Sequence, residues 1–314
     1  MSLYQSHRPA TLDEVIGNDA TVEGLRAHFA QEPTRVSHAH IIYGDSGCGK
    51  TTLARAVARS ILGATDMTIH EINTADNRGI DTIREIIEQL KYPPIGGKSV
   101  VYIIDEAHGL STDAKRALLK PLEDCPKRVF FFLCTTNLKQ LLKGDEGKAI
   151  NTRCTQWEVA PLTPRQVVKL VKGVAVAENY EVDQELLEAI VAAADGSPRA
   201  ALVALEKVMP ITDREQQLAV LKGGLEEDPD TRELCQAILR RAQWGTIAGV
   251  LAKLKNTQDP ETIRRAVTGY MTAVLLKRFD STAALALEAF SENTYDNGFP
   301  AIVLAALRSQ PVGH

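Results

Sequence analysis

Residues 44–52 read Gly-Asp-Ser-Gly-Cys-Gly-Lys-Thr-Thr, and they stand between the short apolar run Ile41-Ile42-Tyr43 and a strongly helix-forming stretch. Glycines at this spacing are typical of a phosphate-binding loop, because they let successive N–H groups turn inward onto a polyphosphate. We expect Lys50 to reach the β and γ phosphates and the Thr51 hydroxyl to bind Mg²⁺. The alternative is a chance match in a glycine-rich turn. The residues expected to hold the phosphates are Gly44, Gly47, Cys48, Gly49, Lys50, Thr51 and Thr52.

Apolar runs of strand length alternate with helical patterns between residues 39 and 159. The runs are continuously apolar, which favours strands covered on both faces and hence a parallel sheet between helices. The sequence therefore predicts an α/β, doubly wound domain with a five-stranded parallel sheet. The expected strands are 39–43, about 68–72, 99–104, 129–134 and 155–159.

The character of the sequence changes beyond Pro161, where Ala, Leu, Glu and Lys recur at helical spacing. Thr163-Pro164, Asp183 and Ser197-Pro198 are helix-start signals and predict three helices up to about residue 208. We interpret Lys222-Gly223-Gly224 as a linker, followed by helices to about residue 308. The predicted domains are a nucleotide-binding domain at 1–160, a small helical lid at 161–222 and a helical domain at 223–314.

The composition is that of an ordinary globular protein, with 314 residues and a formal net charge of -4. This charge excludes a uniformly basic nucleic-acid coat but permits a local basic lining. The five cysteines include no C-x-x-C pair, so neither a zinc site nor a disulfide framework is indicated. No apolar run reaches the length of a membrane span, and we expect a cytoplasmic protein without membrane partners.

Acidic residues end the buried run Val100-Val101-Tyr102-Ile103-Ile104. At the carboxyl end of a parallel strand, Asp105 can hold Mg²⁺ and Glu106 can polarise a water for attack on the γ phosphate. The alternative is that the pair caps the next helix. His108 completes the letters D-E-A-H, and we interpret it as structural. Asn137 follows the Phe-rich run and would emerge at the same sheet edge, where it either positions the attacking water or forms a turn.

Taken in order, these motifs resemble the sliding-clamp loader group of AAA+ ATPases, which comprises replication factor C small subunits, the bacterial motor subunit and phage counterparts. The segment from Arg8 to Asn18, Arg-Pro-Ala-Thr-Leu-Asp-Glu-Val-Ile-Gly-Asn, is similar to the group's R-P-x-T-x-x-x-x-I-G segment. Residues 105–108 and Ala117-Leu118-Leu119-Lys120-Pro121-Leu122-Glu123 resemble the bacterial motor subunit. The resemblance spans residues 4 to about 206, and the last hundred residues match only in length and helical character.

The resemblance assigns roles to further positions. It implies that Arg8, Val15 and Ile16 line the adenine pocket, and that Asn137 is sensor 1. Pro198 and Arg199 open the lid helix, and the resemblance makes Arg199 sensor 2. Thr152-Arg153-Cys154 corresponds to the group's S-R-C motif, so Arg153 would act in trans on the ATP of a neighbouring subunit. The residues implied to contact DNA phosphates are Arg78, Arg84, Arg116 and Lys120.

The resemblance therefore implies a DNA-stimulated ATPase that uses ATP and Mg²⁺, with a sliding clamp and primer-template DNA as partners. Other copies of the chain and a different subunit would complete a pentamer through helical C-terminal collar domains. A short chain, the lack of a zinc module and an intact arginine finger look more like a phage or archaeal-type small subunit than a bacterial one. The chain departs from the group's pattern in a segment between residues 137 and 153 that is longer than in bacterial loaders, and in Ser6-His7, which stand where an aromatic residue is common. The competing hypotheses are a branch-migration or replication-initiator motor, which would carry a basic winged helix, and a nucleotide-gated scaffold that does not hydrolyse ATP.

Overall fold

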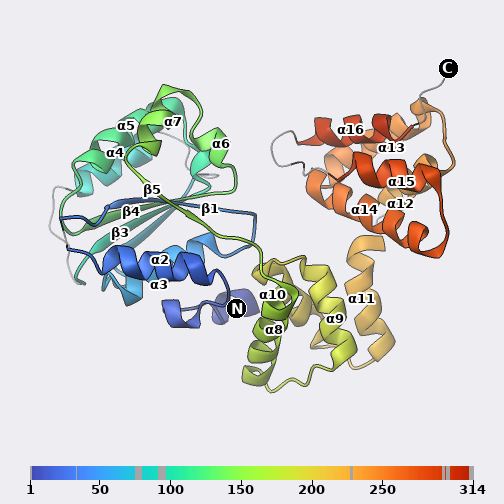
Figure 1. The fold of residues 1–314 in the computed structure, drawn as a ribbon, viewed down its shortest axis with the longest axis horizontal. Coiled ribbons are helices and arrows are strands. Elements are labelled where there is room, and N and C mark those ends of the chain that lie inside the picture. The colour runs from blue at the N-terminus through green and yellow to red at the C-terminus, as the bar shows by residue number, and fades with distance from the viewer. Residues whose placement is uncertain are drawn as a thin grey trace. The chain divides into compact units, whose positions relative to one another are not determined.

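The computed structural model describes residues 2–32, 34–74, 80–90, 97–226, 229–291, 294 and 298–310. The chain divides into two compact units, Met1–Pro210 and Ile211–His314. The first unit contains a sheet with helices around it, and the second is built from helices (Figure 1). Within the described ranges, no helix is long and apolar enough to cross a lipid bilayer.

A five-stranded sheet forms the centre of the first unit, with the strand order β2-β3-β4-β1-β5. Every neighbouring pair is parallel, so the carboxyl ends of all five strands meet at one edge. The register aligns Tyr43 of β1 with Thr135 of β4, and Asn73 of β2 with Asp105 of β3, at that edge. The sheet predicted from the apolar runs is thus confirmed. Its strands are β1 (Ala39–Tyr43), β2 (Ile69–Asn73), β3 (Val100–Asp105), β4 (Val129–Thr135) and β5 (Thr155–Glu158).

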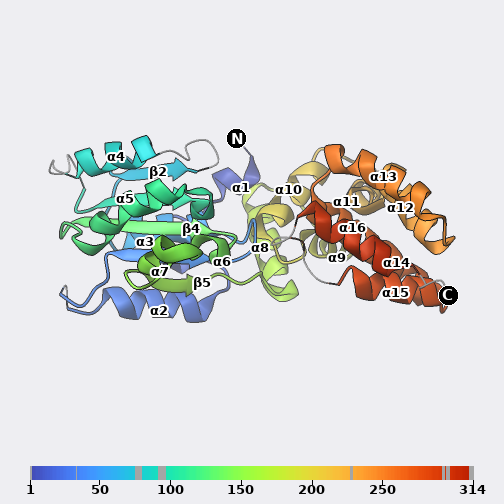
Figure 2. The ribbon, with the colours of Figure 1, turned by 90° about the horizontal axis from the view of Figure 1, so that it is seen from above.

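Helices cover both faces of this sheet (Figures 1 and 2). Alternate strand residues enter two separate cores: Ile42 and Phe132 pack on one face, and Ile41 and Phe131 on the other. All four side chains are fully buried, which explains why the strands read as continuous apolar runs. One face carries α2 (Asp19–Phe29) and α3 (Lys50–Ser60), and the other carries α4 (Ile80–Gln89), α5 (Thr112–Glu123), α6 (Leu138–Leu141) and α7 (Gly144–Asn151).

Three helices follow the sheet, as the sequence predicted: α8 (Pro164–Ala177), α9 (Gln184–Ala194) and α10 (Pro198–Val208). Thr163 and Gln166 form a capping box at the start of α8. Asp183 caps α9 through the Leu186 amide, and Ser197 caps α10. The short helix α1 (Leu3–Ser6) packs against α10. Single turns of 3₁₀ helix cover Leu12–Glu14 and Ala107–Gly109.

The second unit consists of helices around its own apolar core. Ile238, Leu254, Val267 and Phe290 are among its buried residues. The interpretation of Lys222-Gly223-Gly224 as a linker is wrong, because these residues lie inside α11. The predicted boundary at residue 222 therefore falls within a helix of the second unit, which begins after Pro210. Its helices are α11 (Arg214–Glu226), α12 (Pro229–Leu239), α13 (Trp244–Thr257), α14 (Pro260–Lys277), α15 (Ser281–Ala289) and α16 (Phe299–Arg308).

Candidate functional site

The loop of residues 44–49 connects β1 to α3 at the carboxyl edge of the sheet. A Cβ at Gly44 would lie 2.0 Å from the Val159 carbonyl oxygen, so only glycine fits against that backbone. Gly49 precedes α3 with φ of 99°, a left-handed conformation that glycine adopts without strain. The loop therefore delivers its backbone amides to the N-terminus of α3, where the helix dipole favours an anion.

Lys50 lies across this loop rather than pointing into solvent. Its Nζ donates hydrogen bonds to the carbonyl oxygens of Gly44 at 2.9 Å and Asp45 at 2.8 Å. The residue is 6% exposed, and in the described part of the chain no carboxylate forms an ion pair with it. A buried ammonium whose partners are all neutral keeps its positive charge available for an anionic ligand.

Thr51 and Asp105 bring two oxygen atoms together beside the loop. The Thr51 hydroxyl donates to Oδ2 of Asp105 at 2.9 Å, and the other carboxylate oxygen accepts from the Glu106 amide at 3.0 Å. Mg²⁺ prefers such oxygen ligands and is commonly held by one or two of them together with substrate phosphates. Among the described residues no group of three or more His, Cys, Asp or Glu could hold a metal. The pair fits a magnesium site completed by a ligand's phosphates, and magnesium binding by these two residues stays a prediction.

Glu106 is held at the end of β3 by two neighbours. The Thr136 hydroxyl donates to Oε2 of Glu106 at 3.0 Å, and His108 Nδ1 lies 3.3 Å from the same oxygen. His108 also lies 3.1 Å from the Thr135 hydroxyl, which accepts from the Asn137 amide. The histidine that we interpreted as structural is therefore part of the hydrogen-bond network around the candidate base.

Asn137 lies beside this network, and its side-chain oxygen caps the helix that follows. Its Oδ1 accepts from the Gln140 amide at 2.8 Å and caps α6. Its backbone amide is joined to Thr135, as described above. A cavity beside the phosphate loop is lined by Glu106 but, within the described residues, not by Asn137. The turn-forming role is thus realised, and the sensor role stays a prediction.

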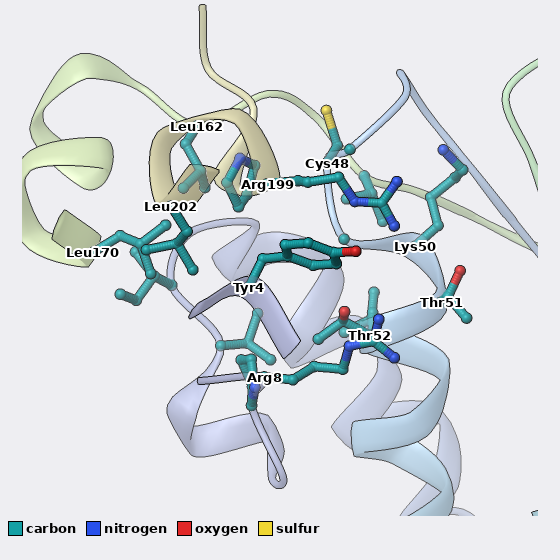
Figure 3. A pocket seen from close by; sticks show the side chains of 18 of the residues that line it. Tyr4, Arg8, Cys48, Lys50, Thr51, Thr52, Leu162, Leu170, Arg199 and Leu202 are labelled. Atoms are coloured by element: carbon teal, nitrogen blue, oxygen red, sulfur yellow. The ribbon is translucent and has the colours of Figure 1, made fainter. Parts of the chain in front are cut away.

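A cavity of about 380 Å³ adjoins the loop (Figure 3). The predicted residues Arg8, Val15 and Ile16 line it together with residues 47–52, Asp105, Pro198 and Arg199. Gly44 supports the loop from outside the lining. The sequence analysis missed further walls, because their apolar spacing is that of ordinary core positions. Among these residues are Tyr4, Pro9, Leu162, Leu170, Val174 and Leu202, and His7 and Glu71 are polar members of the lining.

Arg8 and Arg199 line this cavity together with Glu71, and Arg55 lies behind Glu71 as its ion-pair partner. Arg55 donates to Oε2 of Glu71 from its Nε at 2.7 Å. Burial lowers the pKa of the Arg8 guanidinium, and the nearby charges of Arg55 and Arg199 lower it further. The cations thus repel one another, and an anionic ligand would relieve that repulsion. The cavity combines an apolar end with a cationic end, which suits a nucleotide.

The lid helices reach the phosphate loop through α10. Ser197 Oγ donates to the Gly47 carbonyl at 3.3 Å, and the Arg199 amide donates to the same oxygen at 3.4 Å. The Arg199 guanidinium lies 5.1 Å from the centre of the Tyr4 ring. Loop and lid are therefore joined by backbone as well as by side chains at the cavity.

Arg153 lies at the opposite edge of the sheet. It precedes β5, whose first residue Thr155 is in register with His40, whereas the phosphate loop follows Tyr43. About 10 Å of strand separates those levels. The guanidinium donates to Glu123 Oε2 at 2.6 Å and to the Ala149 carbonyl at 2.9 Å. Arg153 therefore faces away from the cavity of its own chain.

The predicted DNA-contacting residues lie on or before the helices α4 and α5, which pack side by side (Figures 1 and 2). Arg84 and Lys120 are exposed. Arg116 is exposed as well, and its hydrogen bond with Glu146 at 2.6 Å raises the pKa of the Arg116 guanidinium. Arg78 lies outside the described residues. DNA contact by these four residues stays a prediction.

The phosphate loop after β1, the acidic pair at the end of β3 and the three helices after β5 give the chain an AAA+-like P-loop fold. The fold agrees with that of a solved structure, the RuvB Holliday junction branch migration motor of Thermotoga maritima. That match has a TM-score of 0.60 at 19% identity and covers 78% of this chain and 85% of the RuvB chain.

Comparisons with known sequences show which proteins this chain resembles. A family model described as DNA polymerase III, delta subunit, matches residues 63–163. DNA polymerase III subunit tau of Bacillus subtilis is 32% identical over 66% of this chain and 39% of its own length. The replication factor C small subunit of Haloarcula marismortui is 31% identical over 69% of this chain and 65% of its own length. Over about two thirds of its length the chain is thus similar to AAA+ clamp-loader subunits, and it spans about two fifths of the tau relative's length.

Proposed function

We propose that the chain is the ATPase motor subunit of a DNA sliding-clamp loader. The observation that carries this proposal is the convergence of Lys50, the Thr51–Asp105 pair and Glu106 on one cavity with an apolar far end. A P-loop site needs a cation for the phosphates, oxygen ligands for a metal and a base for water, and these residues supply all three. The names of the sequence relatives support replication as the setting.

Each residue has a separate task in the proposed hydrolysis. Lys50 binds the β and γ phosphates, while Thr51 and Asp105 hold Mg²⁺. The bound ion neutralises charge on the phosphate oxygens. Glu106 orients the attacking water and accepts its proton, and the hydrogen bond from Thr136 fixes the direction of that carboxylate. Asn137 contributes a further hydrogen bond to the water.

Hydrolysis requires a second molecule, because Arg153 faces away from the cavity of its own chain. We propose that Arg153 contacts the γ phosphate bound by a neighbour. Copies of the chain and a different subunit then form a pentamer through the helical second unit, Ile211–His314, with the helices between residues 161 and 210 acting as the lid. ATP favours the assembly state that holds an open clamp on primer-template DNA, and hydrolysis releases the clamp.

Two alternative functions are distinguished from a clamp loader by the experiment described below. A branch-migration motor shares the fold, but a winged helix would need strands, and none occurs among the described residues of the second unit. A non-hydrolysing scaffold has no need of Glu106 and its hydrogen-bond partners. The sequence relatives favour the loader over both.

The test is steady-state ATP hydrolysis by the full chain, first alone and then with its partner subunit. Primed DNA, a candidate clamp and both together are added in separate reactions. We expect the greatest stimulation with both ligands, and none with Lys50→Ala. A matched control, Lys143→Ala, removes an exposed cation away from the cavity and should behave as the unaltered chain. Stimulation by four-way junctions alone would indicate a branch-migration motor, and absent turnover with intact ATP binding would indicate a scaffold.

A further inference from the structure

The Arg199 side chain reaches the cavity from a well-anchored backbone. Ser197 caps α10, Pro198 occupies its first turn, and the Arg199 amide donates to the Gly47 carbonyl at 3.4 Å. Along the described parts of the chain, no carboxylate forms an ion pair with the Arg199 guanidinium. The direction of this long, flexible side chain must therefore depend on a different kind of contact.

Tyr4 supplies that contact. The Arg199 guanidinium lies over the Tyr4 ring at 5.1 Å from its centre, within the range of a cation–π interaction. Figure 3 shows Arg199 extended over Tyr4 toward the side of the cavity where Lys50 lies. The ring thus lies beneath an arginine that is aimed at the phosphate loop.

The helix that carries Tyr4 is anchored on the lid. This helix, α1, packs against α10, where Leu3 is buried and its amide donates to Oε2 of Glu206 at 3.4 Å. The two ends of this arrangement, Tyr4 on α1 and Arg199 on α10, are therefore held by the same pair of helices. The Tyr4 ring and the Arg199 guanidinium thus extend from two helices that pack on each other.

Neighbouring cations explain why an aromatic ring, rather than a carboxylate, is the suitable support for Arg199. The charge of Arg199 is among the causes that lower the pKa of Arg8, so the two guanidiniums are close enough to repel each other. The negative face of an aromatic ring attracts a guanidinium without neutralising it. A carboxylate in the same place would hold Arg199 but would also repel a phosphate. A ring is thus the suitable partner for an arginine that must bind an anion.

We propose that Tyr4 is a positioning residue that holds Arg199 toward the terminal phosphate of a bound nucleoside triphosphate. This inference rests on the proposed function and adds a residue to that site. The N-terminal segment then contributes to discrimination between triphosphate and diphosphate, since Arg199 contacts only the phosphate that ADP lacks. Tyr4 touches the reaction through Arg199 alone.

The test is a double-mutant cycle on the full chain, with dissociation constants for ATP and ADP measured by calorimetry. Tyr4→Leu should weaken ATP binding roughly 3- to 10-fold, as expected for the loss of a cation–π contact, and should change ADP binding less than about 2-fold. Tyr4→Phe keeps the ring and should match the unaltered chain. In an Arg199→Ala background, Tyr4→Leu should have no further effect on ATP. Arg165→Ala, on the exposed surface of α8, is the control for removing a lid arginine.

Other results would overturn the inference. Equal losses for ATP and ADP, or the same loss from Tyr4→Leu in the Arg199→Ala background, would mean that Tyr4 contacts the base or sugar directly. Unchanged ATP affinity in Tyr4→Leu would mean that Arg199 does not need the Tyr4 ring to reach the phosphate. Tyr4→Met offers a second ringless side chain should Tyr4→Leu fail to fold. Failure of the unaltered chain to bind ATP would instead refute the proposed function.

Discussion

Glu123, at the last position of α5, accepts two hydrogen bonds from the Arg153 guanidinium, from Nε at 3.1 Å and from Nη2 at 2.6 Å. The Arg153 side chain is 28% exposed and that of Glu123 is 60% exposed. Exposed ion pairs contribute about 1 kcal/mol or less, so Arg153 can exchange Glu123 for a phosphate at small cost. The pair keeps the arginine at the surface of the sheet's amino edge without burying it.

The first prediction concerns the action of Arg153 on a neighbour's nucleotide. Arg153→Ala should assemble normally and lower kcat by about 100-fold or more, as loss of an arginine finger does. Mixing Arg153→Ala chains with Glu106→Gln chains should restore part of the activity, because some interfaces then pair an intact Glu106 with an intact Arg153. Hydrolysis by the mixture, measured against each variant alone, decides the matter. A mixture that stays inactive while assembled would show that Arg153 serves its own chain.

The second prediction concerns the base. Glu106→Gln should lower kcat by roughly 100-fold or more, because an amide cannot accept the proton of water, while the dissociation constant for ATP should change less than about 2-fold. Thr136→Val, which removes the hydrogen bond to Oε2 of Glu106, should lower kcat by about 10-fold. Thr21→Val, which removes a hydroxyl hydrogen bond of α2 outside the cavity lining, is the matched control. Single-turnover hydrolysis and calorimetry separate the two effects, and full turnover by Glu106→Gln would remove Glu106 from the mechanism.

The third prediction concerns DNA. Replacing the exposed Arg84 and Lys120 with Ala should weaken DNA stimulation and make its salt dependence shallower, by up to about 0.9 in the log–log slope per lost phosphate contact. The effect should be the same for different DNA sequences, since phosphate contacts do not read bases. Lys169→Ala with Lys172→Ala removes the same charge from α8 and should leave the slope unchanged. An unaltered slope in the Arg84 and Lys120 variant would move the DNA surface to another part of the chain.

The fourth prediction concerns pH. His40 is fully buried on β1, and burial lowers its pKa to about 3, with the neighbouring His28 adding to the effect. The unfolded chain binds a proton near pH 6.5, so between about pH 3 and 6.5 the unfolded state holds more protons. Stability must therefore rise with pH across that window, and moving from pH 7.5 to 5 should cost the first unit roughly 2 kcal/mol through His40.

Trp157 can report this change, because its Nε1 donates to His40 Nδ1 at 3.1 Å. The chain has two tryptophans, and a Trp244→Phe background leaves Trp157 as the fluorescent probe of the first unit. Urea unfolding at the two pH values should show the loss in that background, and His40→Gln should reduce it. The control His70→Gln should preserve it. An equal loss with and without His40 would assign the pH dependence to other groups.

Local sequence signals predicted the strands and the phosphate loop because the information lies within a few residues. Gly44 and Gly49 meet backbone requirements at the turn itself, and helix caps such as Thr163 need only the next turn of chain. The predicted linker at residues 222–224 was wrong for a related reason. Two adjacent glycines are a local break signal, but the packing of α11 within the second unit overrides it.

Such local signals do not predict contacts between residues that are far apart in the sequence. Tyr4 and Arg199 are 195 positions apart in the sequence, and the residues around Tyr4 carry no signal that predicts this contact. The contact of His108 with Glu106 could not be predicted from the sequence, because it depends on how β3 and β4 end at the same edge of the sheet. The apolar cavity walls Leu162, Leu170 and Leu202 have the same spacing as residues that only fill a core. Their role follows from the fold alone.

If Arg153 acts on a neighbour's nucleotide as proposed, its position at the sheet edge opposite the phosphate loop fixes how many complete sites an assembly of this chain can contain. A row of n copies that does not close on itself contains n − 1 complete composite centres. One terminal copy is left with a cradle that nobody completes, and the other with an arginine that has no target. A dissimilar terminal subunit therefore needs to retain only one half of the machinery, and the choice of half fixes the end at which it can join.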